Sequence, residues 1–285
     1  MNFPYLDHFS FESARLLFFY RHTARYRVSK MADFKLFDAH FHVIDPRFPL
    51  VPNKGFVPER YTLNDYRERL ASYKLCGGAV VSGSFQAFDQ DCLIDALSRL
   101  GPGFAGVTQL PVTVTDEELL ELDKAGVRAI RFNLKRGGSE DVKHLDSMAR
   151  RVHETVGWHL ELYVDAKDLG DLSSTLLALP AVSIDHLGLS AEGLPLLLEM
   201  AERGVKVKAS GFGRVNFDVG TALKNLYAAD PGALMFGTDL PSTRAARPYT
   251  DRDFRLVIDS LGEEAAERVF YTNALGFYRI SKKPD

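Results

Sequence analysis

The feature that most constrains the fold is a regular alternation of strand-like and helix-like segments along most of the chain. Eight short, mainly apolar runs are predicted as β-strands: 36–44, 78–82, 104–110, 127–134, 158–165, 182–186, 205–210 and 233–238. Segments with helical start and stop signals follow them: 62–74, 89–100, 115–125, 141–155, 169–179, 191–203, 218–229, 251–261 and 263–271. Strands separated by helices pair in parallel through crossovers. Eight such units predict an α/β fold, a single-domain (β/α)8 TIM barrel.

An open, doubly wound sheet is the alternative arrangement of the same elements. Such a sheet usually carries a Gly-x-Gly-x-x-Gly turn after a strand. Here Gly211-Phe212-Gly213 follows the seventh predicted strand but lacks the third glycine, and no such turn follows the first strand. The closed barrel is therefore the favoured prediction.

Composition narrows the range of partners and compartments. The 285 residues are 46% hydrophobic, which is ample for a core, and the formal net charge is −3 without long runs of Lys or Arg. Nucleic acid and anionic membranes are therefore not expected as main partners. Cys76 and Cys92 are the only cysteines, so a disulfide framework is not expected and a cytoplasmic setting fits best.

Residues 1–30 differ from the rest of the chain. They carry a short aromatic and aliphatic run flanked by arginines, with Asp7 and Glu12 among them. The run is too short for a signal peptide and the acids argue against a transit peptide. We interpret 1–30 as an N-terminal extension, with Met31 as an alternative natural start, and 31–285 as the barrel domain.

Two histidines stand two residues apart at the end of the first predicted strand, within 37–43. In a regular strand alternate side chains share a face, so Asp38, His40 and His42 are expected on one face and the four apolar residues on the other. Neighbouring imidazoles can share a metal ion or one substrate oxygen. Two incidental histidines at a strand end are the plainer alternative.

Polar groups also stand at the ends of the other predicted strands, where barrel enzymes carry their chemistry. In chain order they are Ser82 and Ser84, Gln109, Arg131 and Asn133, Tyr163 and Asp165, Asp185 and His186, Lys208 and Ser210, and Thr238 and Asp239. Surface loops are polar in any protein, but His, Arg, Tyr, Lys and Asp together favour a functional site.

Three of these strand ends resemble the amidohydrolase superfamily. They read Phe-Asp-Ala-His-Phe-His at 37–42, Ile-Asp-His-Leu-Gly at 184–188 and Phe-Gly-Thr-Asp-Leu-Pro at 236–241. The closer resemblance is to the amidohydrolase-related (family 2) branch, which includes 2-pyrone-4,6-dicarboxylate lactonase, sugar lactonases and lactone isomerases. Segments 131–133 and 207–211 are similar to the lactonases as well, and the resemblance runs from about residue 36 to 278.

The resemblance implies a reactive centre made of His40, His42, His186 and Asp239. These four residues are the candidate ligands for one divalent metal, Zn²⁺ or Mn²⁺, with water completing the coordination. The same four residues could also act without a metal, an alternative that the resemblance to the lactonase branch leaves open. Asp239 would accept a proton from water and return it to the leaving oxygen, while the histidines or a metal polarise the carbonyl.

Two departures from the superfamily pattern argue against a two-metal site. Arg131 stands where two-metal members have a bridging Lys or Glu, and a guanidinium cannot ligate a metal. Tyr163 stands where many relatives have a fifth-strand histidine. His159 lies four residues earlier, roughly 13 Å lower in the strand, so we expect it at the bottom of the barrel.

The remaining strand-end groups suit substrate binding. Arg131 and Lys208 are expected to bind substrate carboxylates, and Tyr163, Ser82 and Ser84 to hydrogen-bond a ring oxygen or hydroxyl. Solvent exposure at the strand end is the alternative for Lys208.

Other nearby charges are given plainer roles. We expect Asp185 to orient His186 or its strand. Arg244 and Arg247 are interpreted as solvated loop charges, with an anion contact as the alternative.

The sequence therefore predicts a hydrolase that opens a carboxylated or sugar-derived lactone, with a small anionic molecule as substrate. A lactone isomerase or a metal-dependent non-oxidative decarboxylase is the alternative reaction, and a non-catalytic ligand-binding barrel is the alternative class. The exposed helices of a barrel leave a homo-oligomer open.

Overall fold

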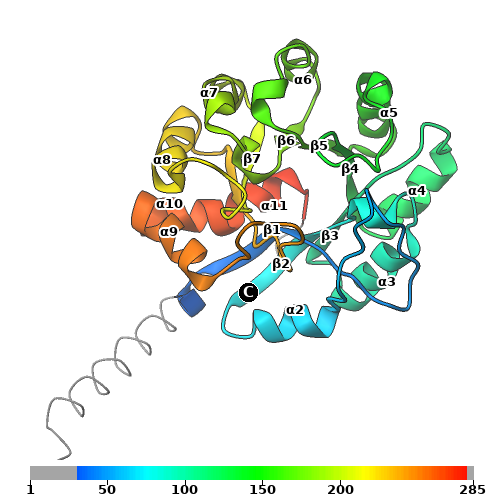
Figure 1. The fold of residues 1–285 in the computed structure, drawn as a ribbon, viewed down its shortest axis with the longest axis horizontal. Coiled ribbons are helices and arrows are strands. Elements are labelled where there is room, and N and C mark those ends of the chain that lie inside the picture. The colour runs from blue at the N-terminus through cyan, green and yellow to red at the C-terminus, as the bar shows by residue number, and fades with distance from the viewer. Residues whose placement is uncertain (1–30, 281–285) are drawn as a thin grey trace, which may run out of the picture.

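Eight parallel strands form the centre of the molecule, and helices surround them (Figure 1). The computed structural model describes residues 31–280. Each strand pairs with its neighbour in chain order. The strands are β1 (Lys35–Phe41), β2 (Lys74–Val81), β3 (Phe104–Thr108), β4 (Val127–Asn133), β5 (His159–Tyr163), β6 (Val182–Ile184), β7 (Lys206–Ala209) and β8 (Leu234–Phe236). The predicted (β/α)8 barrel is confirmed, while the predicted 1–30 extension lies outside the described residues.

The helices follow the strands as predicted, with differences in length. They are α2 (Leu63–Arg69), α3 (Asp91–Leu100), α4 (Asp116–Lys124), α5 (Leu145–Val156), α6 (Ser173–Leu177), α7 (Leu194–Glu202), α8 (Val219–Ala229), α9 (Asp251–Leu261), α10 (Glu263–Glu267) and α11 (Asn273–Phe277). Thr62 and Thr115 form capping boxes at the starts of α2 and α4. The helix predicted over 169–179 is observed only as the short α6, since glycine at 170 and the Ser-Ser-Thr run have low helix propensity.

The barrel closes where β8 meets β1. Phe41 and Leu240 form a parallel bridge, and the His42 amide donates to the Leu240 carbonyl at 2.8 Å. The Asp239 amide donates to the His40 carbonyl at 2.7 Å. A Cβ at Gly237 would lie only 2.7 Å from the His40 nitrogen, so this close approach requires glycine. We call this contact between His40–His42 and Gly237–Leu240 the closing seam.

One feature of β1 departs from the expected alternation. The pairing of β1 with β2 shifts register between Asp38 and Phe41, so β1 carries an extra residue there. Asp38 therefore lies outside the barrel wall with Phe41, where the Phe41 and Tyr66 rings stack at 3.9 Å and Tyr66 donates to Asp38 at 3.2 Å. The prediction that Asp38 shares a face with His40 is wrong, because this bulge turns His40 inward.

The interior of the barrel is filled at one end and polar at the other. Small apolar side chains, among them Ala79, Ala105 and Ala129, pack inside with Phe37. Tyr278, which follows α11, closes this end with its ring centroid 5.3 Å from that of Phe37. The polar strand ends therefore gather at the opposite, C-terminal face. Among the described residues no helix is both long and apolar enough to cross a membrane.

Candidate active site

Three buried histidines converge on one carboxylate oxygen at the C-terminal face. The Nε2 atoms of His40 and His42 each lie 4.0 Å from Oδ1 of Asp239, and that of His186 lies at 3.8 Å. His40 belongs to β1 and His42 follows it, whereas His186 follows β6 and Asp239 follows β8. The structure thus brings together all four residues predicted as the reactive centre.

Backbone conformation aims two of these side chains. His186 has φ 54° and Asp239 has φ 58°, in the left-handed region that non-glycine residues seldom adopt. Such conformations persist where surrounding structure enforces them, often at functional sites. The loop after β7 supports His186, since a Cβ at Gly211 would come within 2.7 Å of its Nδ1.

The imidazoles are held neutral and partly fixed in tautomer. Burial lowers the pKa of His40 and holds the pKa values of His42 and His186 well below the usual range. His42 Nδ1 lies 2.7 Å from the Val81 carbonyl, which can only accept, so its Nε2 presents a lone pair toward Asp239. His186 Nδ1 lies 2.9 Å from Ser210 Oγ.

This cluster could hold a divalent cation. His40 Nε2 and Asp239 Oδ1 are buried and lack a hydrogen-bond partner in the part of the chain that the structure describes. The donor atoms of His40, His42 and Asp239 lie within 4.8 Å of one another, as do those of His40, Asp185 and His186. Neutral imidazoles and a carboxylate are ligands that Zn²⁺ and Mn²⁺ accept.

Asp239 also has an arginine partner that the sequence analysis missed. Arg214 Nε donates to Asp239 Oδ2 at 2.7 Å, and its Nη2 donates to the Thr243 carbonyl at 2.9 Å. Burial opposes the charge on Arg214, but the contact with Asp239 outweighs it and raises its pKa. Arg214 lies in an irregular loop after β7, and the preceding Gly-Phe-Gly is its only local signal.

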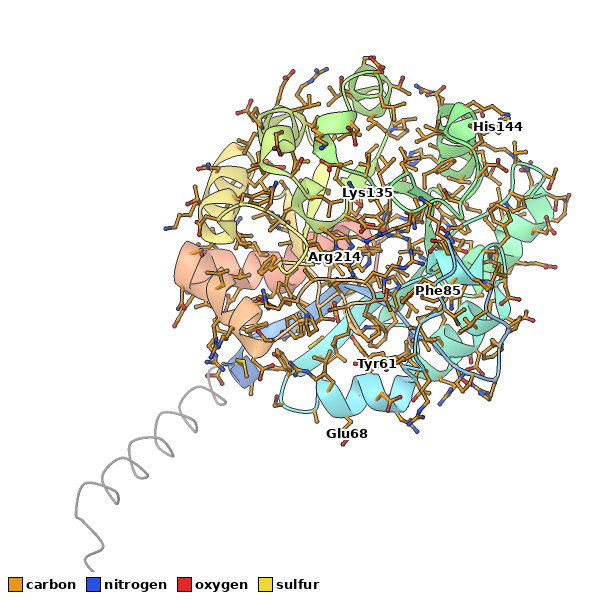
Figure 2. All side chains as sticks on the ribbon, viewed as in Figure 1. Tyr61, Glu68, Phe85, Lys135, His144 and Arg214 are labelled. Carbon is orange, nitrogen blue, oxygen red and sulfur yellow. The ribbon has the colours of Figure 1, made fainter. Side chains whose placement is uncertain are left out.

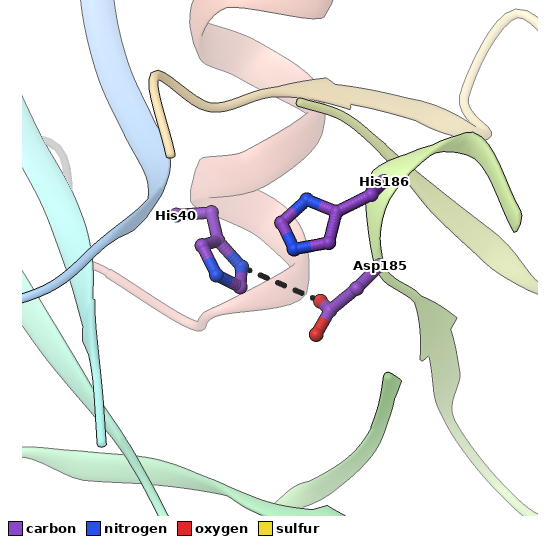
Figure 3. Close-up of side chains that lie close together, drawn as sticks. All are labelled: His40, Asp185 and His186. Carbon is purple, nitrogen blue, oxygen red and sulfur yellow. Dashed lines mark ion pairs between the residues drawn. The ribbon is translucent and has the colours of Figure 1, made fainter. Parts of the chain in front are cut away.

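Asp185 contacts His40, which corrects the expectation that it orients His186. Its Oδ1 lies 3.4 Å from His40 Nδ1, as Figure 3 shows with His186 alongside. Its Oδ2 accepts from Nε and Nη2 of Arg131 at 3.1 and 2.8 Å. Burial would raise the pKa of Asp185, but Lys208 and Arg131 hold it well below its usual range.

Lys208 lies beneath the cluster, away from the predicted substrate contact. Its side chain is fully buried, donates to Glu161, and lies 3.4 Å from Asp185 Oδ1. Burial would raise the pKa of Glu161, but Lys208 and His159 lower it to about 2. His159 lies 3.0 Å from Glu161 at the filled end of the barrel, in line with the expected position. Because Lys208 is fully buried and bonded to Glu161, the expected contact with a substrate carboxylate is wrong.

A cationic pocket lies over the cluster and opens to solvent. Its lining residues are His42, Phe56, Gly83, Ser84, Phe85, Arg131, Asn133, Arg136, Tyr163, His186, Arg214, Thr243 and Arg244. Four are arginines, and none of these lining residues carries a carboxylate. Ser84, Arg131 and Tyr163 lie where they were predicted, whereas Ser82 does not line this pocket. Figure 2 shows Phe85 and Arg214 near the middle of the view, where the strands converge.

Arg244 is a pocket residue, which corrects its interpretation as a solvated charge. Its guanidinium lies 4.1 Å from the centroid of the Phe56 ring and donates to the side chain of Asn53 at 3.0 Å. It thereby fastens the long loop after β1 to the loop after β8. Arg247 instead forms a bidentate pair with Asp253, at 2.7 and 3.0 Å, and does not line this pocket.

The fold and the site define a (β/α)8 barrel whose histidine–aspartate centre lies at the C-terminal ends of its strands. The family profile described as Amidohydrolase matches residues 37–280, so the chain belongs to the amidohydrolase family. The predicted family is thereby confirmed.

Individual relatives agree with this membership. A 2-pyrone-4,6-dicarboxylate hydrolase from Comamonas testosteroni is 33% identical over 162 residues, covering 53% of this chain and only 51% of that protein. A 4-sulfomuconolactone hydrolase from Rhizobium radiobacter is 27% identical over 224 residues, covering 72% of this chain and 75% of that protein. A solved Pseudomonas putida structure, named as a candidate 2-pyrone-4,6-dicarboxylic acid hydrolase, has a TM-score of 0.74 at 25% identity, covering 87% of this chain and 98% of that chain.

Proposed function

We propose that the protein hydrolyses a lactone that carries at least two anionic groups. The observation that carries this proposal is the pocket over the cluster, which is lined by four arginines and by no carboxylate. Arg131 and Arg214 are paired with Asp185 and Asp239, whereas no carboxylate among the described residues pairs with Arg136 or Arg244. Arginines bind carboxylate and sulfonate oxygens through charge-assisted hydrogen bonds. The names of the two curated relatives, a dicarboxylate hydrolase and a sulfolactone hydrolase, support an anionic lactone as substrate.

The proposed hydrolysis needs only water, the lactone and the residues of the cluster. Asp239 Oδ1 takes a proton from water, the hydroxide oxygen attacks the lactone carbonyl carbon, and the ring C–O bond breaks as the carbonyl re-forms. The proton returns from Asp239 to the leaving oxygen. An imidazole that presents an N–H beside Oδ1 would stabilise the oxyanion, and Tyr163 and Ser84, which line the pocket, would hydrogen-bond the substrate.

A metal, where bound, would be held by His40, His42, His186 and Asp239 and would polarise the lactone carbonyl. Each neighbouring carboxylate already has a cationic partner: Asp239 has Arg214, Asp185 has Arg131, and Glu161 has Lys208. We therefore expect lactone turnover to survive treatment with a chelator. Tightly held Zn²⁺ or Mn²⁺ in the purified protein, with turnover lost on its removal, would instead favour the decarboxylase or a metal-dependent amidohydrolase reaction.

A panel of neutral, mono-carboxylated and dicarboxylated lactones tests the proposed reaction. We expect measurable hydrolysis of dicarboxylated lactones only, and Asp239→Asn should lower kcat about 10²- to 10⁴-fold as expected for loss of a general base. Equal, slow turnover by wild type and this variant would show that Asp239 does not have this role. An isomerised product in place of the hydroxy acid would favour the lactone isomerase.

The arginine pocket can be tested with a matched pair of variants. Arg244→Met should raise KM for a dicarboxylated lactone about 10-fold or more, because a charge-assisted contact of about 1.5–3 kcal/mol is lost. Arg247→Met, three residues further on and paired with Asp253, should leave KM nearly unchanged. Similar KM values for the two variants would argue against an anion contact at Arg244.

A non-catalytic barrel is disfavoured, because the four cluster residues lie within hydrogen-bonding or ligand reach of one bound atom. A cytoplasmic location and a homo-oligomer rest on the sequence alone, and fractionation and sedimentation would test them.

A further inference from the structure

The fully buried ammonium of Lys208 has three acceptors around it. It donates to Glu161 Oε2, lies 3.4 Å from Asp185 Oδ1, and lies 3.3 Å from His40 Nδ1. A lysine ammonium has three N–H donors and no acceptor. All three neighbours can face the ammonium favourably only when His40 Nδ1 carries a lone pair.

His40 Nδ1 lies between a hydrogen-bond acceptor, Asp185, and a hydrogen-bond donor, Lys208. Asp185 Oδ1, at 3.4 Å, could accept a hydrogen from Nδ1, whereas Lys208 can only donate to it. A hydrogen on Nδ1 would point into the ammonium hydrogens and leave one buried donor of Lys208 without an acceptor, which is costly. Asp185 Oδ1 lies 3.4 Å from the Lys208 ammonium as well as from His40 Nδ1, and Arg131 balances the charge of this carboxylate by donating twice to Oδ2.

We propose that Lys208 is a positioning residue that holds His40 in the Nε2–H tautomer. His40 then presents a hydrogen-bond donor to the reactive centre, where its Nε2 is buried and has no partner among the described residues. His42 presents a lone pair at the same place, since its Nδ1 hydrogen goes to the Val81 carbonyl. Two histidines two residues apart thus take opposite roles: His40 donates and His42 accepts.

This assignment has a consequence for catalysis that rests on the proposed function. An Nε2–H at His40 can stabilise the oxyanion that forms during lactone hydrolysis, whereas it cannot ligate a metal through that nitrogen. Lys208 therefore favours the donor role of His40 over a ligand role, both through the tautomer and through its own positive charge.

The tautomer can be read directly in the substrate-free protein, so the result does not depend on the lactone assay. Nitrogen-15 NMR of imidazole-labelled wild type distinguishes the two neutral tautomers, with the His40 signals assigned by their loss in His40→Gln. We expect an Nε2–H signal for His40 and an Nδ1–H signal for His42. An Nδ1–H signal for His40 in the wild-type protein would overturn the proposal.

Variants test whether Lys208 sets this tautomer. Lys208→Met should move His40 toward the Nδ1–H form, strengthen Zn²⁺ binding at least 10-fold in a competition titration with a chromophoric chelator, and lower kcat more than it raises KM. Lys206→Met is the matched control, because Lys206 lies on the same strand, is half-buried and pairs with Asp230 at 3.3 Å. It should change neither the tautomer nor the Zn²⁺ affinity.

A second variant covers the case that Lys208→Met does not fold with Glu161 left unpaired. The double variant Glu161→Gln with Lys208→Met removes both charges of that buried pair and should give the same tautomer shift. An unchanged His40 tautomer in a folded variant would refute the role of Lys208, whatever the lactone panel shows.

Discussion

At the scale of single residues, the pairing of Arg214 with Asp239 leaves one oxygen of this carboxylate free to face the histidines. Arg214 Nε occupies Oδ2 at 2.7 Å, so Oδ1 alone faces the three imidazoles. The left-handed backbone at Asp239 and the Thr243 carbonyl that holds Arg214 fix this arrangement. One oxygen is thus anchored while the other is available to take a proton.

Removing this anchor should impair turnover without abolishing the fold. We expect Arg214→Met to lower kcat about 10- to 100-fold, the equivalent of a lost buried charge-assisted hydrogen bond of about 1.5–3 kcal/mol. Steady-state kinetics with circular dichroism as a folding control would measure this. A kcat equal to that of wild type would mean that Asp239 is positioned without Arg214.

At the same scale, sequence reasoning found the residues with motifs and missed those without. His40, His42, His186 and Asp239 could be identified because three segments with a recognisable order carry them. Arg214 could not, because an irregular loop brings it to Asp239 from 25 residues away. Lys208 was correctly placed on its strand but wrongly directed to the substrate, since its partner Glu161 lies on another strand.

At the scale of elements, the pairing of β8 with β1 at the closing seam sets the positions of the site residues. β8 can approach β1 closely only because residue 237 lacks a side chain. The amide of Asp239 and the carbonyl of His40 are hydrogen-bonded across the seam. A change in strand spacing would therefore separate the carboxylate from the imidazoles.

Gly237→Ala should destabilise the fold and inactivate the protein. Its new Cβ would meet the backbone and Cβ of His40 at 2.7 and 2.8 Å, and such overpacking costs about 1–3 kcal/mol. Gly276→Ala is the control, because α11 has open space there and alanine favours helix. Denaturant midpoints should fall for the first variant and stay level or rise for the second; equal midpoints would contradict the steric account.

The prediction of which β1 side chains share a face was partly wrong. The order and type of the elements followed from periodicity, and all eight strands were found. A strict alternation of faces was assumed for 37–43, but the register shift between Asp38 and Phe41 breaks it. A bulge depends on pairing with the neighbouring strand, which one strand's sequence does not contain.

At the scale of the whole molecule, the buried charges beneath the site make stability depend on pH. The folded pKa of Glu161 is about 2, below its ordinary 4.5. A carboxyl with a lowered folded pKa contributes stability that is fully present above pH 4.5 and is lost as the pH falls from 4.5 through about 2. The free energy of unfolding should therefore decrease as the pH falls below 4.5.

Glu161→Gln tests this contribution. The variant should be less stable than wild type at pH 7 by about 3–5 kcal/mol, because the Lys208 charge loses its main partner. The difference should shrink between pH 4.5 and about 2, where wild type loses the same interaction. Denaturation at several pH values would measure it, with Glu121→Gln on the exposed face of α4 as the control. A difference that does not vary with pH would refute the assignment.

The closing seam links local opening of the barrel to disruption of the histidine–aspartate cluster. Opening the barrel between β8 and β1 breaks the two amide hydrogen bonds and, in the same event, parts Asp239 from His40 and His42. If the histidine–aspartate cluster carries the reaction, as proposed, a molecule with an open barrel is inactive. The amides of His42 and Asp239 should exchange their hydrogens with solvent only when the barrel opens at this seam, so their exchange would measure how often the cluster comes apart.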